Sequence, residues 1–225
     1  MTGTLPKKSD LGVRTMSAVV MVAVAGGALW LGGWAWIVFV GLISAGVLWE
    51  WLRLTRVIGR SPVALGLWNC AGFIYIGFAA AMLMFLRSEF FSINAVLTLV
   101  AAVIATDVGA YFAGRTLGGP KIAPKISPSK TWAGLAGGMI GASVVLVLGR
   151  GNNMLADAIA GGMLLAVTAQ AGDFFESWMK RRAGVKDSSH LIPGHGGLFD
   201  RVDGLLAVLF VGGLITMASG LLGLV

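Results

Sequence analysis

The sequence predicts an all-α fold, a polytopic bundle of about seven transmembrane helices with a cytoplasmic N-terminus. Of the 225 residues, 57% are hydrophobic and only 12% are charged, and the mean hydropathy is +0.86. Soluble globular domains carry about a quarter of charged residues. The apolar residues also form separate segments close to the length of about 20 residues with which a helix crosses a bilayer. We therefore expect an integral membrane protein.

The candidate spans follow from the positions of the long apolar runs. In chain order they are Thr15–Leu31, Trp34–Leu52, Pro62–Leu86, Ser92–Ala113, Trp132–Gly149, Leu155–Trp178 and Gly204–Val225. The first two are short and are separated only by Gly32-Gly33, so we expect a tight helical hairpin. Lys7, Lys8 and Arg14 precede the first span as in a signal peptide, but no convincing small-residue cleavage site follows. We expect this span to be retained.

The basic residues predict the orientation of the spans, because cytoplasmic loops of membrane proteins are enriched in lysine and arginine. With the N-terminus inside, fifteen of the seventeen basic residues fall in cytoplasmic segments, and only Arg87 and Arg150 fall outside. One missed or invented span would scatter the later charges over both faces. The net charge of +7 also suits contact with anionic membrane lipids. Because the basic residues follow loops rather than forming a stripe with stacking aromatics, we expect no nucleic-acid partner.

We expect one membrane domain over residues 1–225, since a chain of this length forms one bundle. Residues 1–104 are N-terminal helices with little chemical signal, residues 105–203 are the predicted catalytic region, and residues 204–225 form the last span. Segment 177–203 holds five of the seventeen basic residues, three of the ten acidic residues and both histidines. Ionised groups near hydrocarbon are costly unless they line a polar site, so we expect the active site here.

Carboxylates occur in two pairs at the ends of predicted spans. Asp173 and Glu176 lie near the end of the sixth span, and Asp200 and Asp203 precede the seventh. If these stretches are helical, each pair projects from one helix face and can bind an oxygen-preferring cation such as magnesium. Either pair alone is better explained as helix-end charges, but two pairs flanking one glycine-rich basic loop favour a metal site. Asp107 is a further candidate, because it is an acid inside a span.

The basic residues and glycines of segment 177–203 fit the phosphate half of such a site. Its cations can neutralise phosphate oxygens, although each would also serve as a topology signal. They are Lys180, Arg181, Lys186 and Arg201. Gly196 and Gly197 offer backbone donors in a tight turn. His195 is a candidate ligand, proton carrier or turn-stabilising donor.

A second polar loop, residues 118–131, contains three prolines and three lysines. The prolines exclude a regular helix. The glycine and lysine spacing of a Walker loop is absent. In the predicted topology Lys130 faces the same compartment as the carboxylates, and a plain linker is the alternative interpretation.

Three motifs resemble segments of a known family. The run Ser177-x-x-Lys180-Arg181-x4-Lys186-Asp187-x5-Pro193-Gly194-His195-Gly196-Gly197-x2-Asp200-Arg201-x-Asp203 resembles the complete signature of the phosphatidate cytidylyltransferases, also called CDP-diacylglycerol synthases. Asp107-Val108-Gly109-Ala110-Tyr111 and Ser127-Pro128-Ser129-Lys130-Thr131 also resemble family segments. The chain departs from the family at Ala133, where an acidic residue is expected in many relatives. It also looks short, as if N-terminal spans were missing.

The resemblance implies a membrane-embedded nucleotidyltransferase of phospholipid biosynthesis that makes CDP-diacylglycerol and pyrophosphate from CTP and phosphatidic acid with magnesium. The residues alone lead only to metal-assisted phosphate chemistry at the cytoplasmic membrane face. The catalytic residues implied are Asp173, Lys186, Asp187, Asp200, Arg201 and Asp203. The substrate-binding residues implied are Asp107, Ser127, Lys130, Thr131, Ser177, Lys180, Arg181, His195, Gly196 and Gly197. The magnesium ligands are expected among Asp173, Glu176, Asp200 and Asp203.

The resemblance does not decide whether a second, monovalent cation binds, or whether the protein forms a homodimer. A bacterial inner membrane is the expected location, with the active site on the cytoplasmic side. Two alternative functions remain. A CTP-dependent polyprenol or phytol kinase would use an alcohol rather than a phosphate as acceptor. A membrane transporter is less favoured, because the charges cluster on one face and no clear internal repeat is visible.

Overall fold

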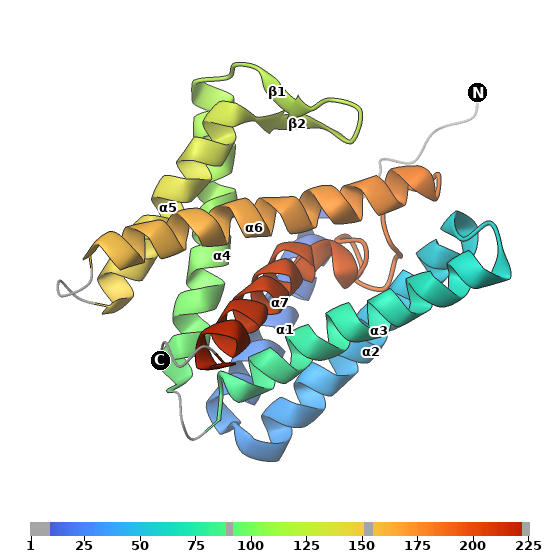
Figure 1. Cartoon of the computed structure of the whole chain (residues 1–225), viewed down its shortest axis with the longest axis horizontal. Coiled ribbons are helices and arrows are strands. Elements are labelled where there is room, and N and C mark those ends of the chain that lie inside the picture. The colour runs from blue at the N-terminus through green and yellow to red at the C-terminus, as the bar shows by residue number, and fades with distance from the viewer. Residues whose placement is uncertain (1–9, 89–91, 151–154, 222–225) are drawn as a thin grey trace.

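The computed structural model describes residues 10–88, 92–150 and 155–221, and long helices dominate them (Figure 1). These helices are α1 (Asp10–Leu31), α2 (Gly33–Ile58), α3 (Pro62–Phe85), α4 (Ile93–Thr116), α5 (Trp132–Arg150), α6 (Leu155–Arg182) and α7 (Phe199–Leu221). Seven helices of the described chain are long and apolar enough to cross a membrane. The predicted all-α membrane bundle is therefore confirmed. Lys7, Lys8 and Val225, which entered the topology prediction, lie outside the described residues.

Several helices extend beyond their predicted spans, and α6 and α7 do so at the ends that carry the carboxylates. Helix α6 continues to Arg182, and α7 begins at Phe199. Gly184 follows the end of α6 with a φ of 73°, and the N–H of Val185 donates to the Lys180 carbonyl at 3.0 Å. Both carboxylate pairs are therefore on helices, as their spacing required.

The loop between α4 and α5 contains a small β-hairpin that the sequence did not predict. Strand β1 (Lys121–Ala123) pairs antiparallel with β2 (Ser127–Thr131). The prolines exclude a helix, as expected, but they are compatible with the edges of a two-stranded sheet. The Thr131 Oγ1 accepts a hydrogen bond from the Gly134 N–H at 3.0 Å. This bond caps α5 and places β2 directly on the start of that helix.

Helices α1 and α2 form the expected tight hairpin. Gly32 and Gly33 have φ values of 64° and 48°, in the left-handed region that favours glycine. The Arg87 Nε donates to the Leu29 carbonyl at 2.9 Å, beside this turn. A side chain at Gly32 would collide with that guanidinium, because its Cβ would lie 2.7 Å from Arg87 Nη2.

Helices α4 and α5 approach each other along a row of glycines. A Cβ added at Gly137 would lie 2.5 Å from the Gly109 carbonyl oxygen, and one at Gly141 would lie 2.5 Å from the Ala105 carbonyl oxygen. Small residues allow such close contact between membrane helices. The pair carries the β-hairpin at one end, as Figure 1 shows.

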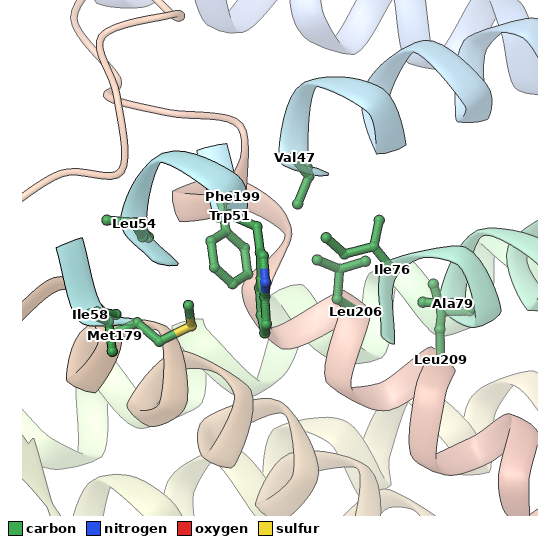
Figure 2. Packing of buried hydrophobic residues seen from close by; sticks show 10 residues of the cluster. All are labelled: Val47, Trp51, Leu54, Ile58, Ile76, Ala79, Met179, Phe199, Leu206 and Leu209. Carbon is green, nitrogen blue, oxygen red and sulfur yellow. The ribbon is translucent and has the colours of Figure 1, made fainter. Parts of the chain in front are cut away.

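Helix α6 runs from the α4–α5 pair towards the ends of α2 and α3 (Figure 1). Trp51 of α2 is 1% exposed and lies in an apolar cluster with residues of α3, α6 and α7 (Figure 2). The rings of Trp51 and Phe199 are 5.9 Å apart, and the indole Nε1 donates to the Trp68 carbonyl at 2.9 Å. This cluster fixes the polar ends of α6 and α7 relative to α2.

Candidate active site

Three carboxylates from two helices meet at the polar ends of α6 and α7. Oxygen atoms of Asp173, Glu176 and Asp203 lie within 4.8 Å of one another. Gly172 makes this approach possible, because a Cβ there would lie only 2.6 Å from the Asp203 carbonyl oxygen. The two helices therefore present their acids to a common point.

Two lysines accompany these acids. Lys130, at the end of β2, forms an ion pair with Asp173. Lys180 forms an ion pair with Glu176 and another, at 2.6 Å, with Asp200. The Ser177 hydroxyl donates to Asp173 Oδ1 at 3.3 Å. The β-hairpin and α6 thus supply positive charge to the same cluster.

Asp107 belongs to this neighbourhood as well. It lies exposed on α4, and its charge interacts with those of Asp173 and Lys130. The charge of Asp203 interacts with those of Asp107, Asp173 and Lys130. Four helices or strands that are distant in the sequence thus contribute to one charged site.

The donor set fits a divalent cation such as magnesium. Glu176 is 1% exposed, and its Oε1 has no hydrogen-bond partner within the described parts of the chain. A buried carboxylate oxygen without a partner is costly. Three carboxylates around one point also repel each other unless positive charge lies between them. Magnesium prefers such oxygen ligands.

Asp200 has a different environment from the other three predicted ligands. Its Oδ2 accepts from the N–H groups of Ser188 and Gly197, at 3.1 and 2.8 Å, and from the Ser188 hydroxyl at 3.0 Å. Its Oδ1 accepts from Lys180. These bonds connect the 184–198 loop to α7 and orient the lysine that also contacts Glu176.

Sequence reasoning missed Glu50, a fully buried carboxylate in the middle of an apolar run of α2. It accepts hydrogen bonds from the hydroxyls of Ser188 and Ser189 at 2.9 and 2.5 Å. It also accepts from the N–H groups of Leu198 and Phe199 at 2.9 and 2.7 Å. Anionic oxygens are favourable at a helix N-terminus, and here a second helix provides one for α7. Its position as a lone acid inside a predicted span was the available signal.

An open cavity of about 510 Å³ lies along the 184–198 loop. Five of the predicted site residues line it, namely Lys186, Asp187, His195, Gly196 and Arg201. Arg201 donates through its guanidinium to the carbonyl of His195, with Nε at 2.9 Å. Gly196 has a φ of 84° and lies beside the Asp200 carboxylate, which contacts the cluster through Lys180.

Four predicted residues have other surroundings. Arg181 is exposed on the last turn of α6, and no ion pair links it to the cluster among the described residues. Ser127 pairs with Ala123 at the start of β2. The Thr131 hydroxyl caps α5. Gly197 leaves no room for a side chain, because a Cβ would lie 2.6 Å from Glu50 Oε1. Their contacts with substrate stay predictions.

Comparison with known proteins identifies the family. The sequence profile of the Cytidylyltransferase family matches residues 12–72 and 64–217. The chain belongs to this family. A phosphatidate cytidylyltransferase of Brucella suis is 41% identical over 192 residues, which cover 78% of this chain and 69% of the relative. One of Rickettsia bellii is 34% identical over 213 residues, which cover 89% of this chain and 88% of the relative.

These likenesses extend beyond the motifs of segment 177–203. The profile begins at residue 12, so the N-terminal helices also follow the cytidylyltransferase pattern. The family indicated by the motifs is confirmed, as is the prediction of a membrane-embedded nucleotidyltransferase.

Proposed function

We propose that the site formed by α4, β2, α6 and α7 transfers the cytidylyl group of CTP to phosphatidic acid, with magnesium as cofactor. One observation carries the proposal in particular: Asp173, Glu176 and Asp203 converge beside two lysines. This is the combination that binding a metal together with phosphate requires. The names of the relatives supply the substrates.

In the proposed reaction, a phosphate oxygen of phosphatidic acid forms a bond to the α-phosphorus of CTP. The bond between that phosphorus and the bridging oxygen breaks, and pyrophosphate leaves with the electron pair. The products are CDP-diacylglycerol and pyrophosphate. Such transfers depend mainly on positioning and charge neutralisation, so no side-chain nucleophile is needed.

Asp173, Glu176 and Asp203 would hold the magnesium ion. When bound, this ion would neutralise phosphate oxygens as negative charge shifts to the leaving group. The oxygens of Asp200 already accept four hydrogen bonds, so Asp200 would act by orienting Lys180 rather than as a metal ligand. Lys130 and Lys180 each contact a proposed metal ligand, so a bound cation would release them to contact phosphate oxygens.

The site is proposed to face the cytoplasm from a bacterial inner membrane. The distribution of basic residues supports this orientation, and CTP is available on that side. Membrane lipids would then provide the acceptor directly. A homodimer and a second, monovalent cation stay predictions.

Labelled CTP tests the proposal against the kinase alternative. The full chain is purified in detergent, mixed with vesicles that contain phosphatidic acid, and supplied with magnesium and CTP labelled at the α-phosphorus. Label is expected in the lipid fraction on thin-layer analysis, and the Asp203→Asn variant serves as the inactive control. A CTP-dependent kinase would transfer label only from the γ-position. Lipid labelled from γ-labelled CTP, and unlabelled from α-labelled CTP, would refute the proposal.

A further inference from the structure

The N-terminal helix contacts the proposed active site, although the sequence suggested only a topological role for its one basic residue, Arg14. The Ser17 hydroxyl lies 2.8 Å from His195 Nδ1 and donates to the Pro193 carbonyl at 3.1 Å. A Cβ added at Gly194 would lie 2.8 Å from Arg14 Cγ. Arg14 is therefore packed on the turn that forms one wall of the 510 Å³ cavity, and it lines this cavity itself.

The cavity carries an excess of positive charge. Arg14, Lys186 and Arg201 line it, whereas Asp187 is the one carboxylate among its lining residues. Within the described ranges, none of the three cations forms an ion pair. His190 and His195 add two imidazoles. Cations that converge on a cavity without carboxylate partners are typical of an anion site.

The position of the cavity limits which anion it can serve. Gly196 lines it and directly adjoins Asp200, whose Oδ1 accepts from Lys180. Lys180 in turn contacts Glu176 of the carboxylate cluster. Asp200 and Lys180 thus lie between the cavity and the proposed metal site and contact both, so a phosphate group in the cavity would be a neighbour of the reacting groups.

We propose that Arg14 of α1, together with the cations of segment 177–203 in this cavity, is a ligand for a phosphate group of a substrate. The proposal rests on the proposed function for the identity of the substrates. The phosphate is either the triphosphate tail of CTP or the phosphomonoester of phosphatidic acid. Both carry the same chemistry, and arginine suits both because its planar guanidinium forms paired hydrogen bonds to phosphate oxygens.

Kinetics of Arg14→Met test the proposal, with Arg14→Lys as the conservative variant and Arg56→Met as the matched control. Arg14 and Arg56 are both exposed, but Arg56 lies on α2 and is not among the cavity residues. For Arg14→Met we expect the KM of one substrate to rise roughly tenfold, the scale of one lost charge-assisted hydrogen bond. A rise for CTP assigns the cavity to the triphosphate, and a rise for phosphatidic acid assigns it to the lipid. Arg14→Lys should restore part of the loss.

If the KM values of Arg14→Met for both substrates equal those of Arg56→Met, the proposal is wrong even though the enzyme is active. A second measurement does not depend on turnover. Inorganic pyrophosphate is titrated calorimetrically into the full chain in detergent, and Arg14→Met should weaken its binding by a similar factor. Should the unmodified chain show no transfer from CTP to phosphatidic acid, this titration decides alone. Weakening by Arg14→Met would then keep the anion site while the proposed function fails, and equal affinity in both variants would refute the site.

Discussion

The main-chain N–H of Phe199 donates to Glu50 Oε2 at 2.7 Å, across 149 residues of sequence. The same Phe199 packs its ring against Trp51, the neighbour of Glu50 in α2. One turn of α2 therefore holds the start of α7 by a charged hydrogen bond and by ring contact. Asp200 and Asp203 follow directly, so the position of the acids in α7 depends on a helix from the other end of the chain.

Glu50→Gln is expected to lower both stability and activity. The amide keeps the shape but replaces one acceptor oxygen with a donor, so at least two of the four hydrogen bonds to Glu50 lose their acceptor. Each buried donor left without a partner costs about 1–3 kcal/mol. The melting temperature in detergent should fall clearly below that of Asp157→Asn, an exposed carboxylate on α6. Equal melting temperatures would show that Glu50 does not hold α7.

The sequence predicted the helices well because each membrane span carries its own local signal. It also placed Asp173, Glu176 and Asp203 in one site, since the motif spacing puts them near the ends of two spans. It did not predict Glu50 as a partner of α7, because nothing local to residue 50 indicates which distant N–H groups it accepts from. The hairpin at residues 121–131 was missed because its prolines exclude a helix without specifying a strand pairing.

Asp203→Asn and Asp200→Asn should both reduce activity, but through different defects. Loss of a proposed ligand at Asp203 should lower kcat by at least roughly 100-fold, because even groups that only support metal ligands cost about 10–100-fold when removed. It should also raise the magnesium concentration at half-maximal activity. Asp200 instead orients Lys180 and the 184–198 loop. Asp200→Asn should therefore have a lower kcat, with little change in the magnesium concentration at half-maximal activity. Titration of magnesium against initial rate separates the two, and the same shift in both variants would restore Asp200 as a ligand.

Gly137→Val should destabilise the α4–α5 pair. A Cβ at this position would lie 2.5 Å from the Gly109 carbonyl oxygen, so the two helices must separate. Overpacking of this kind costs about 1–3 kcal/mol. Gly66→Ala on α3 is the control, because a Cβ there meets nothing within 4 Å. Thermal unfolding in detergent should show a lower melting temperature for Gly137→Val alone. An unchanged value would mean that α4 and α5 do not need this close approach.

Orientation in the membrane decides whether the proposed site can receive CTP, and single cysteines can measure it. In a Cys70→Ser background, cysteines are placed one at a time at Ser129 in β2, at Val185 after α6, and at Asn152 between α5 and α6. Ser129 and Val185 are exposed, so a reagent can reach them, whereas Asn152 lies outside the described residues. Intact cells are treated with a maleimide that does not cross the inner membrane.

Only the cysteine at position 152 should react in intact cells, because the fifteen-to-two split of basic residues predicts that the β-hairpin and the 184–198 loop face the cytoplasm. All three should react once the membrane is permeabilised, which controls for access. Lys130 follows Ser129, and Lys186 follows Val185. The two cysteine positions therefore report on the two loops that contribute lysines to the proposed site. Labelling of either in intact cells would place proposed phosphate-binding residues on the opposite side of the membrane from cytoplasmic CTP. The proposed reaction could not then take place at this site.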